Sequence, residues 1–247
     1  MRTSGNTVLI TGGATGIGFA IAEKLVGMGN TVIICGRREE KLDEAKKRLP
    51  GIQAIRCDIS REDERARLHD SVCKNFGDIN ILINNAGIQR RIDLKRGMED
   101  ILKNEDEIEI NLRSQIYLSA RFVPALLQRG ESAIVNVSSG LGFVPLAMFP
   151  IYCATKAAIH SFTMSLRHQL RDSQIKVFEV IPSTVYDTEL KGKPIEKTDW
   201  TVSAEDVAAA VVDGIGSDEY EIAVGPAKAW TIASRGDIDR AFKEINH

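Results

Sequence analysis

The sequence has few of the features that mark metal sites, membrane segments or nucleic-acid surfaces. Its four cysteines form no C-x-x-C pair and its four histidines are scattered along 247 residues, so no metal site is expected. With 32 basic and 34 acidic residues the net charge is −2, which indicates neither a nucleic-acid nor a membrane partner. The longest apolar runs have the length of a β-strand and fall well short of the ~20 residues that span a bilayer.

Two further absences concern location and domain number. The first residues, MRTSGNTVLITGG, lack the pattern of a secretory signal, and cysteines without a pairing pattern are typical of a reducing compartment. We therefore expect a cytoplasmic protein. The chain has no internal repeat and no low-complexity linker, and its length is ordinary for one α/β domain. The sequence thus predicts a single domain over residues 1–247.

Short apolar runs alternate with amphipathic helical stretches along the chain. The runs are continuously apolar, as expected for strands of a parallel sheet that helices cover on both faces. This order predicts a Rossmann-type, doubly wound α/β fold with about seven parallel strands. Strands are expected at 7–11, 31–35, 52–57, 79–84, 132–139, 176–181 and 221–225. Helices are expected at 16–28, 39–49, 61–76, about 106–129, 151–171 and 203–214. Ser60 and Ser203 are placed to cap two of these helices.

A glycine-rich stretch, TGGATGIG, connects the first expected strand to the first expected helix. Gly12, Gly16 and Gly18 would allow a tight turn and a close approach of the backbone to a pyrophosphate, with helix amides such as that of Ile17 facing the negative charge. An ordinary glycine turn is the alternative, but the position between a strand and an amphipathic helix favours dinucleotide binding. Three residues separate Gly12 from Gly16, so the spacing differs from G-x-G-x-x-G.

This glycine stretch resembles the TGxxxGxG motif of the short-chain dehydrogenases/reductases. Four more motifs follow in the order and at the separations of that family: NNAG at 84–87, Asn111 in IEINL, the serines of VSSG, and YCATK at 152–156. The resemblance covers essentially the whole chain. More narrowly, NNAGIQ, SGLGFVPLAMFPIYCATKAAIHSF and LRHQLRD resemble the DltE-type branch of oxidoreductases. The resemblance implies a nicotinamide cofactor and a reaction that interconverts a carbonyl and an alcohol.

Tyr152 and Lys156 are four residues apart on an expected helix and therefore share one face. A free tyrosine has a pKa of about 10, and a nearby ammonium favours the phenolate. Lowering that pKa by ~3 units corresponds to about 4 kcal/mol, which Lys156 and a positively charged nicotinamide ring would supply together. The resemblance makes Tyr152 the acid/base and assigns the nicotinamide ribose hydroxyls to Lys156. It makes Asn111 the anchor of a water that relays protons to the lysine; the alternative for Asn111 is a solvent-facing helix residue.

Two serines compete for the polarisation of a substrate carbonyl. Ser139 lies 13 residues before Tyr152, which is the family's usual separation, and Ser138 is one residue too far. Neighbouring side chains of a strand face opposite ways, so one serine alone can point into the site. We choose Ser139 and expect Ser138 to bond local groups.

The end of the second expected strand bears on the choice of cofactor. An acidic residue there would bind the ribose of NAD, whereas an arginine would accommodate the 2′-phosphate of NADP. The position carries Gly36 and Arg37, followed by Arg38, and the first acid is Glu39. This favours NADP over NAD, although Thr15 stands where NADP-using relatives often have a basic residue. The alternative is that both arginines are simply solvated.

The resemblance assigns further positions around the cofactor. Asp58 corresponds to the residue that meets the adenine ring, and Asn85 to the backbone-spacing residue of NNAG. The family often has glycine after Pro182, and here Ser183 follows, while Thr188 is available to hydrogen-bond the nicotinamide amide. Residues 183–202 are polar and irregular, which indicates a mobile lid.

These observations predict an NAD(P)-dependent oxidoreductase that uses NADP and interconverts a carbonyl and a secondary alcohol on a small molecule. An alternative from another class is a regulatory protein that senses NADP(H) without turnover, against which the complete Asn-Ser-Tyr-Lys set speaks. Epimerases and dehydratases of nucleotide-sugars usually have a two-residue glycine spacer and a longer C-terminal region than this chain. In the family the two long helices pack against a second copy, so a homodimer or homotetramer is expected.

Overall fold

The computed structural model describes residues 1–103, 106–188, 190 and 194–246. A seven-stranded sheet has the order β3-β2-β1-β4-β5-β6-β9, and each neighbouring pair is parallel. Its strands are β1 (Thr7–Thr11), β2 (Thr31–Gly36), β3 (Gln53–Arg56), β4 (Ile81–Asn84), β5 (Ser132–Val137), β6 (Ile175–Pro182) and β9 (Glu221–Val224). The predicted doubly wound fold is confirmed. Because β1 pairs with both β2 and β4, the strand order reverses there, and ligands bind such sheets at the carboxyl edge of this point.

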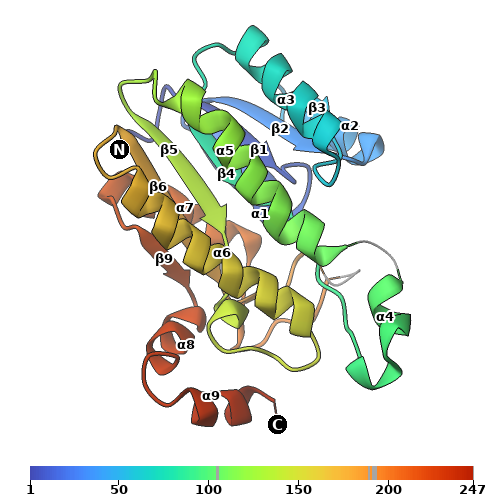
Figure 1. Cartoon of the computed structure of the whole chain (residues 1–247). Helices are drawn as coiled ribbons and strands as arrows, with labels where there is room; N and C mark the ends of the chain where they lie inside the picture. The colour runs from blue at the N-terminus through green and yellow to red at the C-terminus, as the bar shows by residue number, and fades with distance from the viewer. Residues whose placement is uncertain (104–105, 189, 191–193, 247) are drawn as a thin grey trace.

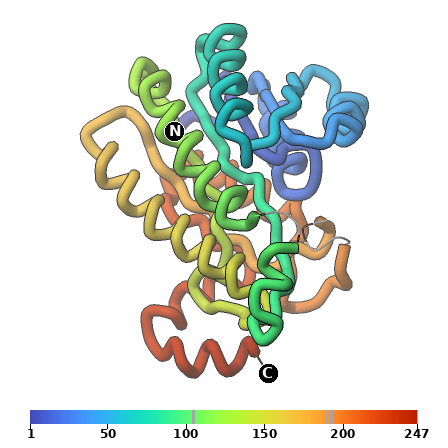
Figure 2. Tube along the Cα trace, turned by 45° about the vertical axis from the view of Figure 1, so that its right-hand side comes forward, coloured from blue at the N-terminus to red at the C-terminus, as the bar shows by residue number. Residues whose placement is uncertain are grey.

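Helices cover both faces of the sheet. They are α1 (Gly16–Gly27), α2 (Glu39–Arg48), α3 (Glu62–Asn75), α4 (Met98–Leu102), α5 (Ser114–Leu126), α6 (Pro150–Gln169), α7 (Ala204–Ser217), α8 (Ala227–Ala233) and α9 (Ile238–Ile245). Figure 1 shows α3, α5 and α6 crossing one face. Side chains of α1, α2 and α7 pack in the core of the other face. Helices α4, α8 and α9 extend beyond the carboxyl edge of the strands (Figures 1 and 2).

The core consists of two apolar layers because successive residues of each strand face opposite sides. In β1, Val8 and Ile10 pack toward α1 and α7, whereas Leu9 packs toward α3 and α5. All three are completely buried. Burial on both faces is the reason that the strand sequences are continuously apolar.

The predicted helix caps have different outcomes. Ser203 caps α7: its Oγ accepts a hydrogen bond from the amide of Asp206 at 3.0 Å, and the Asp206 carboxylate accepts one from the Ser203 amide at 2.9 Å. The cap predicted at Ser60 is wrong, because α3 begins at Glu62 and the Ser60 hydroxyl donates to Asp58 Oδ1 at 2.7 Å. The residue before the helix is Arg61, and no side chain of the described residues caps the first amides of α3.

Two segments differ in detail from the prediction. The helix expected at about 106–129 contains a π-helical turn, Glu109–Arg113, before α5. The segment 183–202 holds two short parallel strands, β7 (Thr184–Val185) and β8 (Thr201–Val202), while residues 189 and 191–193 lie outside the described residues. The mobility of this segment stays a prediction.

Membrane spans and metal sites, which the sequence did not indicate, can be considered for the described residues. None of the helices in the described ranges is long and apolar enough to cross a membrane. The same part of the chain holds no group of three or more His, Cys, Asp or Glu side chains placed to bind a metal ion.

Candidate active site

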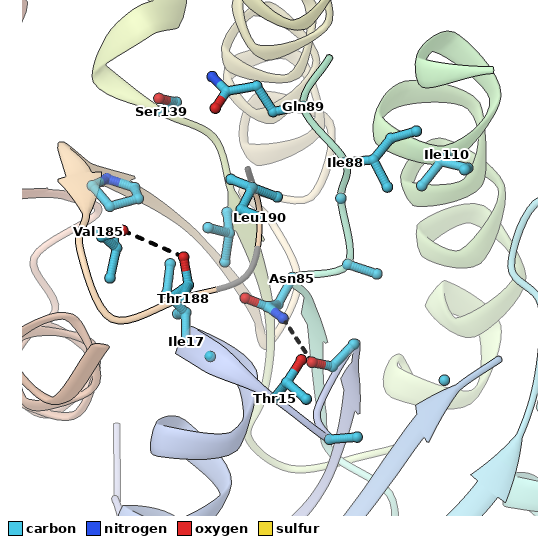
Figure 3. Close-up of a pocket in the computed structure, with 18 of the residues that line it drawn as sticks. Thr15, Ile17, Asn85, Ile88, Gln89, Ile110, Ser139, Val185, Thr188 and Leu190 are labelled. Atoms are coloured by element: carbon cyan, nitrogen blue, oxygen red, sulfur yellow. Dashed lines mark hydrogen bonds between the residues drawn. The ribbon is translucent and has the colours of Figure 1, made fainter. Parts of the chain in front are cut away.

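One cavity follows the carboxyl edge of the central strands, where the strand order reverses (Figure 3). Its walls come from the β1–α1 turn, the ends of β2 to β5, helix α6 and the segment after β6. The predicted site residues that line it are Gly12, Gly16, Ile17, Arg37, Asp58, Asn85, Ser139, Tyr152, Lys156 and Thr188. Gly18 and Asn111 are not among the described residues that line the cavity. Both contact residues that do line it: Gly18 packs against Gly12, and Asn111 bonds the backbone of Ile88.

The glycine turn brings bare backbone to the floor of the cavity. Gly12 and Gly16 have φ values of 65° and 54°, the left-handed region that favours glycine. A Cβ on Gly18 would lie 2.4 Å from the carbonyl oxygen of Gly12, so a side chain there would force the turn apart. Asn85 holds the turn from the next strand, because its Nδ2 donates to the carbonyl of Thr11 at 2.9 Å. Since α1 begins at Gly16, its first amides face a cradle that suits a pyrophosphate.

Basic side chains surround the end of the cavity next to β2. Arg37 and Arg38 line it directly after the strand, and Lys41, from the first turn of α2, lines it too. The Lys41 ammonium also pairs with Glu44 at 2.8 Å. Lys41 was not predicted, although it stands one helical turn after Arg37 in the sequence. Across the cavity, Asp58 Oδ1 accepts a hydrogen bond from the Ser60 amide at 3.0 Å, which fixes its carboxylate.

Tyr152 and Lys156 lie in the first half of α6 and point to the opposite end of the cavity. The Lys156 Nζ is 5.6 Å from the centre of the Tyr152 ring and donates to the carbonyl of Val137 at 2.8 Å. Both side chains are buried, with exposures of 5% for the tyrosine and 3% for the lysine. Burial lowers the pKa of Lys156 to about 8, and the negative charge of Glu179 opposes this effect.

The expected lowering of the Tyr152 pKa is not produced by the residues of the chain. Burial raises the pKa of Tyr152 well above its ordinary value, a hydrogen bond with Ser139 acts in the opposite direction, and the charges of Cys153 and Glu107 raise it further. The physical reason is that a fully enclosed phenolate loses its hydration. The predicted lowering depends on Lys156 together with a positively charged nicotinamide ring, so it stays a prediction for the protein with its cofactor bound.

The two serines at the end of β5 have different environments. Ser139 lines the cavity, and its Oγ accepts a hydrogen bond from the amide of Leu141 at 3.1 Å. Ser138 also contributes to the lining, but its hydroxyl donates to the buried Glu179 Oε1 at 2.5 Å. The structure thus leaves Ser139 as the serine in contact with Tyr152.

Asn111 is fully buried in the π-helical turn, so the solvent-facing alternative is wrong. Its amide makes a reciprocal pair of bonds with the backbone of Ile88: Oδ1 accepts from the amide at 2.8 Å, and Nδ2 donates to the carbonyl at 2.8 Å. Nδ2 also donates to Thr155 Oγ1 at 3.3 Å. Asn111 therefore fixes the segment after β4 against α6, and its predicted water stays a prediction.

The remaining lining includes Thr188, which was predicted, and Gln89, Leu190 and Ile195, which were not predicted as site residues. Gln89 is 9% exposed and lies with Ser139 at one end of the cavity (Figure 3), while Leu190 and Ile195 add apolar surface. Thr188 packs over Gly16 and donates to the carbonyl of Val185 at 3.3 Å. These side chains come from loops, and loops carry no periodic pattern from which their direction could be predicted.

Ser183 also lines the cavity, at the position where the family often has glycine. Its hydroxyl is buried, and it has no hydrogen-bond partner among the residues that the structure describes. The backbone here still lines the cavity, from Pro182 to Val185. It is held against β9, because the Ser183 amide donates to the carbonyl of Val224 at 3.3 Å.

Comparison with known proteins agrees with this geometry. Residues 6–199 match the model of the short chain dehydrogenase family. The chain is 45% identical over 249 aligned residues to the uncharacterized oxidoreductase DltE of Bacillus subtilis (strain 168), covering 100% of this chain and 98% of that protein. It is 30% identical to the NADP-dependent 3-hydroxy acid dehydrogenase YdfG of Salmonella typhi, covering 83% of this chain and 86% of that protein.

A solved structure is similar as well. The short chain dehydrogenase from Burkholderia cenocepacia J2315, in complex with NADP, has a TM-score of 0.83 and 25% identity, with 99% of both chains covered. The chain therefore belongs to the short-chain dehydrogenase/reductase family, and within it to the DltE type.

Proposed function

We propose that the protein is an NADP-dependent oxidoreductase that interconverts a carbonyl and a secondary alcohol on a small molecule. The observation that carries this proposal is the meeting of Tyr152, Lys156 and Ser139 at one end of a cavity whose other end holds the glycine turn. The names of similar proteins support it, since the Salmonella typhi relative is an NADP-dependent 3-hydroxy acid dehydrogenase and the Burkholderia structure holds NADP.

The cradle fits a nicotinamide dinucleotide because it is bare backbone at a helix N-terminus, with basic side chains beyond it. The residues that would hold the dinucleotide are Gly12, Gly16, Ile17, Gly18, Arg37, Asp58, Asn85, Tyr152, Lys156 and Thr188. Of these, Arg37 would bind the 2′-phosphate of NADP, and Thr188 would reach the nicotinamide amide. When bound, the group supplies the hydride donor or acceptor.

The protein's own residues handle the proton. Tyr152 carries its proton at neutral pH, as a tyrosine ordinarily does, and burial raises its pKa further. Its hydroxyl can therefore donate a proton to a carbonyl oxygen, and the resulting phenolate can take one back from an alcohol. Ser139 would hold the same oxygen by a hydrogen bond and orient it toward the tyrosine. Lys156 places a positive charge beside the Tyr152 ring and would stabilise the phenolate left after proton donation.

A screen of NADPH oxidation against aldehydes, ketones and quinones tests this function. We expect at least one class of carbonyl to be reduced by the wild type and not by Tyr152→Phe. Equal rates for the two proteins on every substrate would contradict the proposal.

We also propose a homodimer or homotetramer built on α5 and α6. Both helices lie on the outside of the sheet (Figure 1). Large apolar side chains are exposed on them or directly after them: Tyr117 of α5 at 42%, Leu127 just after α5 at 47%, and Met164 of α6 at 52%. Covering such side chains in a two-fold contact removes apolar surface from water. Light scattering at micromolar concentration should give a mass of two or four chains. A species of 27.2 kDa alone would rule the assembly out.

The chain is proposed to form a single domain that acts in the cytoplasm. Strands from both halves of the sequence share one sheet, so we expect one cooperative unfolding transition. All four cysteines are free, and three of them are buried, which suits a reducing compartment. Two separated transitions, or recovery of the protein with oxidised cysteines, would contradict these two proposals respectively.

A further inference from the structure

A buried carboxylate, Glu179, lies on β6 below helix α6 and has no part in the function proposed above. Its side chain is completely buried. Oε1 accepts the hydroxyl of Ser138 at 2.5 Å, and Oε2 lies 2.7 Å from Nδ1 of His160. A buried carboxylate is costly unless its oxygens are bonded, and here both are.

A chain of hydrogen bonds connects Glu179 to the surroundings of Lys156. Tyr152, Lys156 and His160 are spaced by four residues along α6 and therefore share one face of the helix. Along the helix axis each lies about 6 Å beyond the one before it. The Lys156 Nζ donates to the carbonyl of Val137. The next residue, Ser138, bonds Glu179, which in turn bonds His160, one turn beyond the lysine.

The lysine needs a counter-charge because an ammonium enclosed by protein loses its hydration. Glu179 is the group whose charge raises the Lys156 pKa against the effect of burial. Without such a charge, a buried lysine becomes neutral near physiological pH. The carboxylate thus stands where it can hold the positive charge that Tyr152 requires.

His160 connects this carboxylate to the surface, since 23% of its side chain is exposed. The ring packs on Phe143 at 4.5 Å between centroids. The hydrogen bond to Glu179 raises the pKa of His160 and is the largest effect, while burial lowers this pKa. The charge of Glu221 on β9 also raises the pKa of His160, and the charge of Arg235, after α8, lowers it. Lys156 lies one turn before His160 on the same helix face.

We propose that Glu179 is a positioning residue that keeps Lys156 an ammonium, and that His160 sets the strength of this counter-charge by exchanging a proton with solvent. When His160 is protonated, its cation neutralises Glu179. When His160 releases its proton at higher pH, Glu179 acts on Lys156 unopposed. The pair therefore widens the pH range over which the lysine stays charged. The value of that charge to catalysis rests on the function proposed above.

The test is a titration of Lys156 by NMR in the full-length protein labelled with 13Cε-lysine, with the signal assigned by Lys156→Arg. Glu179→Gln keeps the shape and removes the charge, so the Lys156 pKa should fall by about one unit or more. The matched control is Glu221→Gln, which removes the carboxylate paired with Glu179 in the β6–β9 register. Because Glu221 acts on His160, this variant should move the His160 inflection to lower pH, but it should leave the main Lys156 titration unchanged. A Glu179→Gln protein with the wild-type Lys156 titration would overturn the proposal.

A second variant tests the part of His160 and does not depend on the folding of Glu179→Gln. His160→Gln keeps a donor for the carboxylate and cannot carry a proton. The wild-type Lys156 signal should show a second, smaller inflection where His160 titrates, and His160→Gln should lack it. An inflection that persists in this variant, or is absent from the wild type, would refute the role of His160.

Kinetics then separate this inference from the proposed function. In Glu179→Gln the alkaline loss of kcat should move to lower pH together with the lysine, with KM little changed. A lysine that shifts while the kcat profile does not would leave Glu179 as its counter-charge and would contradict the catalytic role of Lys156.

Discussion

The two ends of the cavity are built in different ways. The dinucleotide end is made of backbone and strand termini, and a Cβ at Gly18 would lie 2.4 Å from a carbonyl oxygen. The rest of the lining includes Gln89, which lies beside Ser139 at the substrate end (Figure 3), and Leu190 and Ile195, and all three come from segments without regular structure. The first end serves a ligand of constant chemistry and tolerates little change, whereas loops can vary without disturbing the sheet. A family motif therefore predicts the cofactor class from one end, and it says nothing of the substrate that the other end accepts.

The largest expected effect is at the chemical end of the cavity. Tyr152→Phe removes the hydroxyl and keeps nearly all of the packing, so turnover should fall at least ~10²-fold, the low end for loss of a general acid/base. NADPH binding should be nearly unchanged, which steady-state kinetics and a fluorescence titration would check together. If the variant had the wild-type kcat on a working substrate, Tyr152 would have no part in the chemistry, and the reaction could not be assigned to this end of the cavity.

Much of the fold was predictable because its signals are local. Burial of each strand on both faces requires continuous apolar runs, and the Ser203 cap depends on residues three positions apart. Helix α8 has no such local signal, because its position depends on a contact between distant residues. The ring of Trp230 packs against Gly140, ninety positions earlier in the chain, so closely that a Cβ on Gly140 would lie 2.4 Å from the ring. The π-helical turn likewise depends on the bonds of Asn111 to Ile88 and Thr155, which belong to distant segments.

The site was predictable to the same extent. The four-residue spacing of Tyr152 and Lys156 predicts one helix face, and both do line one cavity. The direction of the Tyr152 pKa was not predictable, because it depends on burial by the assembled fold. Glu179 was not predicted either, since a strand-interior acid in the sequence gives no sign that Ser138 and His160 will bond it.

The next effect sharpens the comparison at the dinucleotide end. If Arg37 holds the 2′-phosphate, the contact is charge-assisted and contributes about 1.5–3 kcal/mol, so Arg37→Ala should weaken NADPH binding about 10- to 150-fold. NADH has no 2′-phosphate and should be much less affected. Arg37→Asp should go further, since it repels the phosphate and offers an acceptor to the ribose of NAD. Calorimetric titration of both cofactors measures the change.

Arg38→Ala is the matched control for this prediction, because the neighbouring guanidinium lines the same part of the cavity. If NADPH binding weakened strongly in Arg38→Ala and only slightly in Arg37→Ala, Arg38 would be the residue that binds the 2′-phosphate. Wild-type protein that binds NADH as tightly as NADPH would show that neither arginine selects the cofactor, and the NADP assignment would be wrong.

The smallest expected effect tests whether the glycine turn is as tight as its geometry indicates, by comparing two glycines of α1. A Cβ on Gly18 would meet the Gly12 carbonyl at 2.4 Å, whereas a Cβ on Gly27 would have no heavy atom within 4 Å. Gly18→Ala should therefore lower the free energy of unfolding by about 1–3 kcal/mol, the usual cost of overpacking, and weaken NADPH binding as the turn moves. Gly27→Ala should raise the free energy of unfolding by about 0.4–1 kcal/mol, because alanine restricts the unfolded chain and suits a helix. Urea denaturation of the two variants and the wild type measures both changes. If Gly18→Ala proved as stable as Gly27→Ala and bound NADPH normally, the dinucleotide end would tolerate change as readily as the substrate end, and the contrast between them would fail.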